Sequence, residues 1–132
     1  MEASSLADNK YVSITTFRKD GTPKPVPVWI TEVGNGTVGF TTASSSWKVK
    51  RLANNPKVLL QPSDSRGRVV EGSTAVTGSA RVAVGGPEFE RVKNLVRKKY
   101  GIQHALIGGF GKFMSLIGRG SGSDAAVIIT LD

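Results

Sequence analysis

Side chains that bind anions are concentrated about a third of the way along the chain: Ser44, Ser45, Ser46, Trp47, Lys48, Lys50 and Arg51. Serine hydroxyls at a helix start accept hydrogen bonds from unpaired N–H groups, and the remaining N–H groups and the helix dipole attract a phosphate. Asn54-Asn55-Pro56 ends such a helix, because the residue before proline is pushed out of the helical conformation. The pattern therefore predicts a short helix whose start binds an anion. A solvated amphipathic helix is the alternative.

The two sides of this predicted helix differ in chemistry. A helical wheel gathers its apolar residues on one face: Val49, Leu52 and Ala53. The Trp47 indole and the cations Lys50 and Arg51 take the opposite face, and Lys48 lies at the border between the two faces. The helix is therefore expected to pack on the core through one side and to present cations on the other.

No other set of side chains suits acid–base, nucleophilic or metal chemistry. The chain has no cysteine and one histidine, His104, so it lacks a Cys–His pair and a metal site. Residues 108–112 (GGFGK) are rich in glycine, but they lack the spacing of a phosphate-binding loop. The catalytic residues stay unidentified. If the protein is an enzyme, a bound cofactor is expected to supply the reactive atom.

The composition sets the class of protein. A chain of 132 residues predicts one domain spanning 1–132, and 18 Lys+Arg against 10 Asp+Glu give a net charge of +8 that attracts anionic partners. The basic residues are scattered, and aromatic residues make up only 7%, which argues against nucleic acid as the partner. No apolar run is long enough to cross a membrane, and we expect a cytoplasmic protein.

The first third of the chain predicts three strands. Tyr11–Phe17 alternates and is rich in β-branched residues, and residues 25–33 follow as its hairpin partner. Pro25 and Pro27 cannot donate ladder hydrogen bonds, so this partner should be an edge, an opening or a bulge. Thr37–Thr42 completes an expected antiparallel meander.

Three more strands are expected after the predicted helix. Lys57–Ser63 is largely apolar, which predicts burial on both faces. Residues 75–84 form the next strand, with Gly78 as a candidate bulge, and residues 125–131 form the last. Six strands with helical insertions predict a small Greek-key barrel.

A longer helix is expected between the last two strands. Pro87 opens it, Gly101 ends it, and an apolar stripe marks its buried side: Phe89, Val92, Val96 and Tyr100. Residues 102–117 form a weaker helical stretch interrupted by glycines, and residues 118–123 form a flexible loop.

Several stretches match a known family in their order and spacing: residues 11–17, 18–23, 27–29, 41–42, 48–52, 55–58 and 78–81. With these stretches, nearly the whole chain resembles the split-barrel flavin and deazaflavin oxidoreductases related to pyridoxamine 5'-phosphate oxidase. It is most similar to their actinobacterial branch that uses coenzyme F420. The resemblance implies a mainly β fold, a six- to seven-stranded antiparallel Greek-key split barrel, and a homodimer with the cofactor in a groove between the subunits.

The resemblance also implies roles for residues. The family's phosphate-binding lysine falls on Lys48, with Lys50 and Arg51 as support. The segment 26–30, which includes Val28 and Trp29, would pass along the ring system. Thr41, Thr42 and the three serines would contact the ribityl chain and the phosphate.

The implied cofactor is coenzyme F420, with FMN as the alternative. FMN oxidases of this family usually carry an arginine just before the phosphate-binding lysine, whereas this chain has Trp47. The arginine-rich carboxy-terminal signature of the true oxidases is also missing. The F420 tail, a phosphodiester followed by glutamates, is more anionic than the single phosphate of FMN. Further cations could follow that tail, namely Arg66, Arg68 and Arg119.

We therefore expect an F420H2-dependent reductase that transfers a hydride to an unsaturated small molecule. An FMN-dependent oxidoreductase of the same fold and a non-catalytic protein that binds F420 or another anionic ligand are the alternatives. The substrate itself cannot be inferred, because a fold does not determine it.

Overall fold

The computed structural model describes residues 3–34, 36–106 and 123–132. Its helices are α1 (Ala3–Ala7), α2 (Trp47–Asn54) and α3 (Gly86–Leu106). Its strands are β1 (Tyr11–Phe17), β2 (Pro23–Val28), β3 (Thr31–Gly34), β4 (Thr37–Thr42), β5 (Lys57–Ser63), β6 (Val76–Val84) and β7 (Ala125–Leu131). In this part of the chain, no helix has the length and apolar character needed to span a membrane.

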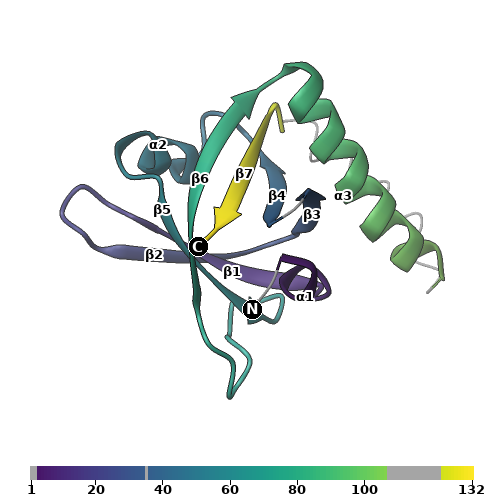
Figure 1. Ribbon diagram of the computed structural model, residues 1–132, viewed down its shortest axis with the longest axis horizontal. Coiled ribbons are helices and arrows are strands. Elements are labelled where there is room, and N and C mark those ends of the chain that lie inside the picture. The colour runs from purple at the N-terminus through teal and green to yellow at the C-terminus, as the bar shows by residue number, and fades with distance from the viewer. Residues whose placement is uncertain (1–2, 35, 107–122) are drawn as a thin grey trace.

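The strands form one mainly antiparallel β structure in the order β2-β1-β5-β6-β7-β4-β3 (Figure 1). The predicted fold class is confirmed, with seven strands. The predicted meander is wrong, because the chain breaks at Trp29 and Ile30 and the two hairpins β1–β2 and β3–β4 lie at opposite ends of the strand order. Ile30 is fully buried at this break, so the chain crosses the core there instead of continuing along one edge.

The proline-rich strand lies where its missing N–H groups are tolerated. β2 pairs with β1 alone and ends the strand order, so the predicted edge is confirmed. Pro25 and Pro27 lie opposite Thr15 and Ser13 of β1. The single strand predicted over residues 25–33 is wrong, because it is divided into β2 and β3.

The strand buried on both faces is β7, whereas we expected β5. Val127 and Ile129 belong to the larger core cluster, while Ala126 and Ile128 pack with Phe89 beneath α3. Alternate β7 residues thus serve two apolar layers, as the period of two in a strand requires. β5 instead alternates between buried and more exposed positions. In Figure 1, α3 lies to the right of β7, and it contacts β3, β4 and β7.

Gly78 of β6 marks a close backbone approach instead of a bulge. Its register is continuous with Val58 on one side and Leu131 on the other. A Cβ at this position would lie 2.8 Å from the carbonyl oxygen of Thr130 and 3.0 Å from Cγ2 of Ile129. Glycine is required here because the neighbouring strand β7 leaves no room for a side chain.

The long helix is confirmed, but its predicted end is wrong. Phe89, Val92 and Tyr100 are buried as expected, and Val96 is partly buried. α3 continues through Gly101 to Leu106, because a glycine inside a helix costs only about 1 kcal/mol and does not by itself stop it. Of the weaker helical stretch and the loop expected over residues 102–123, the part from 107 to 122 lies outside the described residues.

Candidate functional site

The predicted helix after the three serines is present as α2. The Ser46 hydroxyl caps its first turn by accepting a hydrogen bond from the Val49 N–H at 3.4 Å. Thr42, at the end of β4, donates its hydroxyl to the same oxygen at 3.4 Å. The Asn55 N–H closes the other end on the Arg51 carbonyl at 2.9 Å. Local capping therefore fixes α2 directly between β4 and β5.

The faces of α2 differ in part from the helical-wheel prediction. Leu52 is buried and Val49 is half-buried, but Ala53 is exposed, so its assignment to the apolar face is wrong. The helix rests on β1 and β6. Leu52 and Lys48 are one turn apart and therefore share the side that faces them. Trp47 points away from the core, with 67% of its surface exposed.

An open groove of about 630 Å³ lies between α2 and the β1–β2 turn. We call it the basic groove, and it is lined by Phe17, Arg18, Lys19, Trp47, Lys50, Arg51 and Asn54. Four of these side chains are cationic, and none of these lining residues is acidic. The Lys50 ammonium lies 4.6 Å from the centre of the Trp47 ring, and the Arg51 guanidinium donates to the Thr16 hydroxyl at 3.4 Å.

Three of the predicted binding residues, Trp47, Lys50 and Arg51, thus share one groove. The other wall, formed by Phe17, Arg18 and Lys19, was not predicted from the sequence. Its only local signal was a basic turn beside a strand. That signal does not reveal that α2 packs on β1, about 30 residues earlier in the chain.

Lys48 lies outside the basic groove, on the half-buried side of α2. Burial, with a further contribution from the charge of Arg51, lowers the pKa of the Lys48 ammonium below its usual value. Within the described residues, no carboxylate or carbonyl pairs with this ammonium. Lys48 is therefore a partly desolvated cation whose charge is not compensated from within residues 3–34, 36–106 and 123–132.

The serine turn before α2 is engaged by an acidic residue. Asp124, just before β7, accepts the Ser44 N–H at 2.6 Å and the Ser44 hydroxyl at 2.7 Å. These hydrogen bonds lower the pKa of the Asp124 carboxyl. Ser44 therefore has fewer donors for an external phosphate than its type predicts. Ser45 is exposed and Thr41 is half-buried beside this turn.

The residues predicted to lie along the cofactor ring are in a different region. Val28 pairs with Val12 at the start of β1, whereas the basic groove lies at Phe17, roughly 17 Å away at about 3.4 Å per residue. Trp29 stacks on Tyr100 of α3, with ring centroids 4.5 Å apart and planes at 8°. Within a single chain, the residues predicted to contact the cofactor ring and those predicted to bind the phosphate do not come together in this groove.

Tyr100 and Lys99 fasten this second region to α3. The Tyr100 hydroxyl accepts the Ile30 N–H at 2.9 Å and donates to the Lys10 carbonyl at 2.7 Å. The Lys99 ammonium donates to the carbonyls of Ala7, Asn9 and Ile30 at 2.5, 3.0 and 2.6 Å. Burial raises the pKa of Tyr100 to about 12 and lowers that of Lys99 to about 8.

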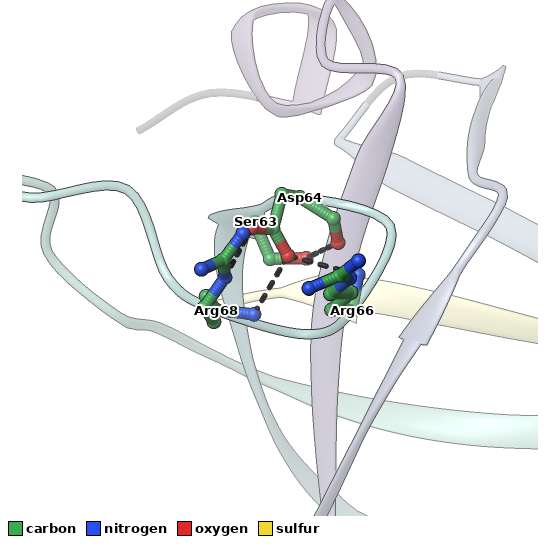
Figure 2. A network of polar contacts seen from close by, with 4 residues as sticks. All are labelled: Ser63, Asp64, Arg66 and Arg68. Atoms are coloured by element: carbon green, nitrogen blue, oxygen red, sulfur yellow. Dashed lines mark hydrogen bonds and ion pairs between the residues drawn. The ribbon is translucent and has the colours of Figure 1, made fainter.

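The additional arginines are not part of the basic groove. Arg68 is paired with Asp64 at 2.7 Å, and Asp64 also accepts the backbone N–H groups of Arg66 and Arg68 (Figure 2). This turn follows Ser63, the end of β5 that lies farther from α2. Gly67, within the turn, packs beside Pro27. Arg119 lies outside the described residues.

The chain matches the family model of pyridoxamine 5'-phosphate oxidase over residues 2–131. No curated protein matches it. Among solved structures, HupZ of Group A Streptococcus is 18% identical, with a TM-score of 0.64 over 98% of this chain and 86% of that one. An F420 reductase is 16% identical, with a TM-score of 0.63 over 100% and 94%. A conserved hypothetical protein of Mycobacterium tuberculosis is 20% identical, with a TM-score of 0.59 over 98% and 78%. These identities support the fold alone.

Proposed function

The chain belongs to the pyridoxamine 5'-phosphate oxidase family, and from this premise we propose that it is an oxidoreductase that uses coenzyme F420. In this proposal the chain would hold the reduced deazaflavin, whose chemistry would be hydride transfer to an unsaturated small molecule. The basic groove is the observation that carries the proposal. Four cations beside an exposed indole, with no acidic lining residue, suit a ligand that joins an aromatic part to several negative charges.

The groove fits the F420 tail better than a single phosphate. Its volume of about 630 Å³ is in the range of small-molecule sites. The tail of F420 carries a phosphodiester and glutamates, which can pair with Arg18, Lys19, Lys50 and Arg51 in turn. FMN brings one phosphate and would leave most of these cations unpaired.

Lys48 supports a phosphate site at the start of α2. Among the described residues the half-buried Lys48 ammonium has no counter-charge, which is unfavourable, and an anion beside it would offset that cost through charge-assisted hydrogen bonds. The first-turn N–H groups of α2 other than that of Val49, which Ser46 caps, add donors of the right polarity. The side chains present therefore fit a phosphorylated cofactor.

We further propose that a second copy of the chain completes the site. Val28 and Trp29 lie at the opposite end of β1 from the basic groove, so the ring and the tail of one cofactor are best accommodated between two subunits related by a two-fold axis. Light scattering at micromolar concentration tests this, and a stable monomer would contradict it.

The chemistry supplied by the bound deazaflavin would be hydride transfer. The residues of this chain would bind and orient. Lys48 and the basic groove would hold the charged part, and the Trp29 ring, stacked on Tyr100, would present a fixed wall to the ring system. Catalysis would then come from positioning the substrate against the cofactor and from excluding water.

Titration of the purified protein with F420 and with FMN tests the cofactor, followed by turnover assays with F420H2 and a panel of quinones and enones. We expect tighter binding of F420 than of FMN and hydride transfer to at least one acceptor. Tight FMN binding without F420 binding would favour the FMN-dependent alternative. F420 binding without turnover across the panel would favour a non-catalytic binding protein.

A further inference from the structure

Asp124 holds the serine turn at the start of α2 with both carboxylate oxygens. One oxygen accepts the Ser44 N–H at 2.6 Å and the other accepts the Ser44 hydroxyl at 2.7 Å. The backbone of Asp124 is also fixed, because its N–H donates to the Thr42 carbonyl at 3.3 Å and its carbonyl accepts the Gly85 N–H at 2.8 Å. A carboxylate therefore occupies a defined place beside the proposed phosphate site.

The donors of Ser44 are consumed by this internal anion. An incoming phosphate then depends on the Lys48 ammonium and on the first-turn N–H groups of α2 other than that of Val49, which Ser46 caps, and the Asp124 carboxylate is fixed on the serine turn that precedes them. Such a site distinguishes ligands by the charge on the phosphorus group, because each added negative charge on the ligand is repelled by the carboxylate.

We propose that Asp124 is a specificity-determining residue, whose fixed carboxylate admits a singly charged phosphodiester and disfavours a doubly charged phosphomonoester. This inference rests on the proposed function, because it assumes that the phosphate of a flavin-type cofactor lies at the start of α2. It goes further by assigning the preference for F420 over FMN to a residue that belongs to neither α2 nor the basic groove.

The charge states of the two ligands make the idea testable. A phosphomonoester has a second pKa of about 6, so FMN is mostly a dianion at pH 7.5 and mostly a monoanion at pH 5.5. A phosphodiester carries one charge at both pH values. The hydrogen bonds from Ser44 lower the pKa of the Asp124 carboxyl, so Asp124 stays ionised across this range.

The experiment measures dissociation constants for F420, FMN and phosphate-free riboflavin at pH 5.5 and 7.5, with the wild-type chain, Asp124→Asn and Asp64→Asn. Asparagine keeps the shape and an oxygen acceptor for Ser44 but removes the charge. Asp64→Asn is the matched control, because Asp64 also accepts backbone N–H groups in a turn but lies beyond the far end of β5.

For Asp124→Asn at pH 7.5, we expect FMN binding to tighten by roughly three- to tenfold and F420 binding to change by less than about twofold. Riboflavin binding and the Asp64→Asn variant should show no such change. The tightening of FMN binding in Asp124→Asn, relative to riboflavin, should be larger at pH 7.5 than at pH 5.5, because the carboxylate repels the dianion more strongly than the monoanion.

An unchanged ratio of FMN to F420 affinity in a folded Asp124→Asn chain would overturn the inference, as would an equal loss for both ligands, which indicates a purely structural role. If Asp124→Asn does not fold, Asp124→Ser is measured in the same series, and an unchanged ratio of FMN to F420 affinity in that chain would contradict the inference. Failure to bind F420, with FMN binding that still tightens in Asp124→Asn, would overturn the F420 assignment but leave the charge effect standing. Binding of neither cofactor would overturn both.

Discussion

Two half-buried lysines, Lys48 and Lys99, have contrasting surroundings. The Lys99 ammonium donates to three backbone carbonyls at 2.5–3.0 Å and ties α3 to the start of the chain and to the β2–β3 break. Lys48, on α2, is comparably buried, but no acceptor pairs with it among the residues that the structure describes. Burial of a cation alone therefore does not indicate a binding site. Unsatisfied donors on a buried cation do indicate one. The donors of Lys48 therefore favour the α2 region as the ligand site, and the satisfied donors of Lys99 favour the α3 region as a structural support.

The largest effect is expected for a substitution in the α3 region, which acts as a structural support. Tyr100→Ala would create a cavity at a fully buried ring that stacks on Trp29, and we expect the free energy of unfolding to fall by roughly 3–5 kcal/mol. Urea denaturation followed by circular dichroism measures this. Tyr100→Phe keeps the ring and leaves the Ile30 N–H unpaired, so a smaller loss of about 1–3 kcal/mol is expected. A loss below about 1 kcal/mol for Tyr100→Ala would contradict the structural role.

Lys48→Ala tests the other half of the comparison. Losing a charge-assisted bond to a phosphate should weaken cofactor binding by about 1.5–3 kcal/mol, or roughly ten- to a hundredfold. The free energy of unfolding should change by within about 0.5 kcal/mol, because no internal partner in the described chain loses a bond. Lys98→Ala, an exposed lysine of α3, is the control and should change neither quantity. Unchanged affinity in a folded Lys48→Ala chain would exclude Lys48 from the phosphate site.

The pH dependence of stability provides the subtlest test. Burial lowers the pKa of Lys99 from 10.5 to about 8, so between pH 8 and 10.5 the unfolded chain binds more protons than the folded one at this residue. The wild-type chain should therefore gain stability relative to Lys99→Met as the pH rises through this window. The change should be small, because Lys99 is only half buried and solvent screens its charge. Urea midpoints of both chains at pH 7.5 and 10 measure it. A difference that does not vary with pH would mean that the three carbonyls hold the ammonium charged in the folded chain.

Local signals in the sequence predict most elements but not their partners. Tyr11–Phe17, Thr37–Thr42 and Lys57–Ser63 are confirmed to the residue, because alternation and turn residues are properties of short segments. The pairing of β4 with β7 is not visible, because a period of two says which face is buried and not which strand lies alongside. Gly78 illustrates this limit, since its role depends on Thr130, about 50 residues away.

The candidate site follows the same division. Trp47, Lys50 and Arg51 are neighbours on one helix, and their grouping was predictable from helical spacing alone. The contacts that modify the site join distant segments, namely Asp124 with Ser44 and Trp29 with Tyr100. Each requires the tertiary fold, so no pattern of residue types could identify it. The binding role of the predicted residues stays a prediction.

The prolines of β2 also affect how the molecule behaves at high concentration. Pro23, Pro25 and Pro27 occupy every second position, so one long side of this terminal strand carries no N–H donors at these positions. Because β2 keeps its ladder with β1, the donors of Lys24 and Val26 are turned inward, and the bare side is turned outward. A strand from another molecule cannot add there in the way that seeds fibrils. The prolines thereby protect the exposed part of this sheet end from misassembly.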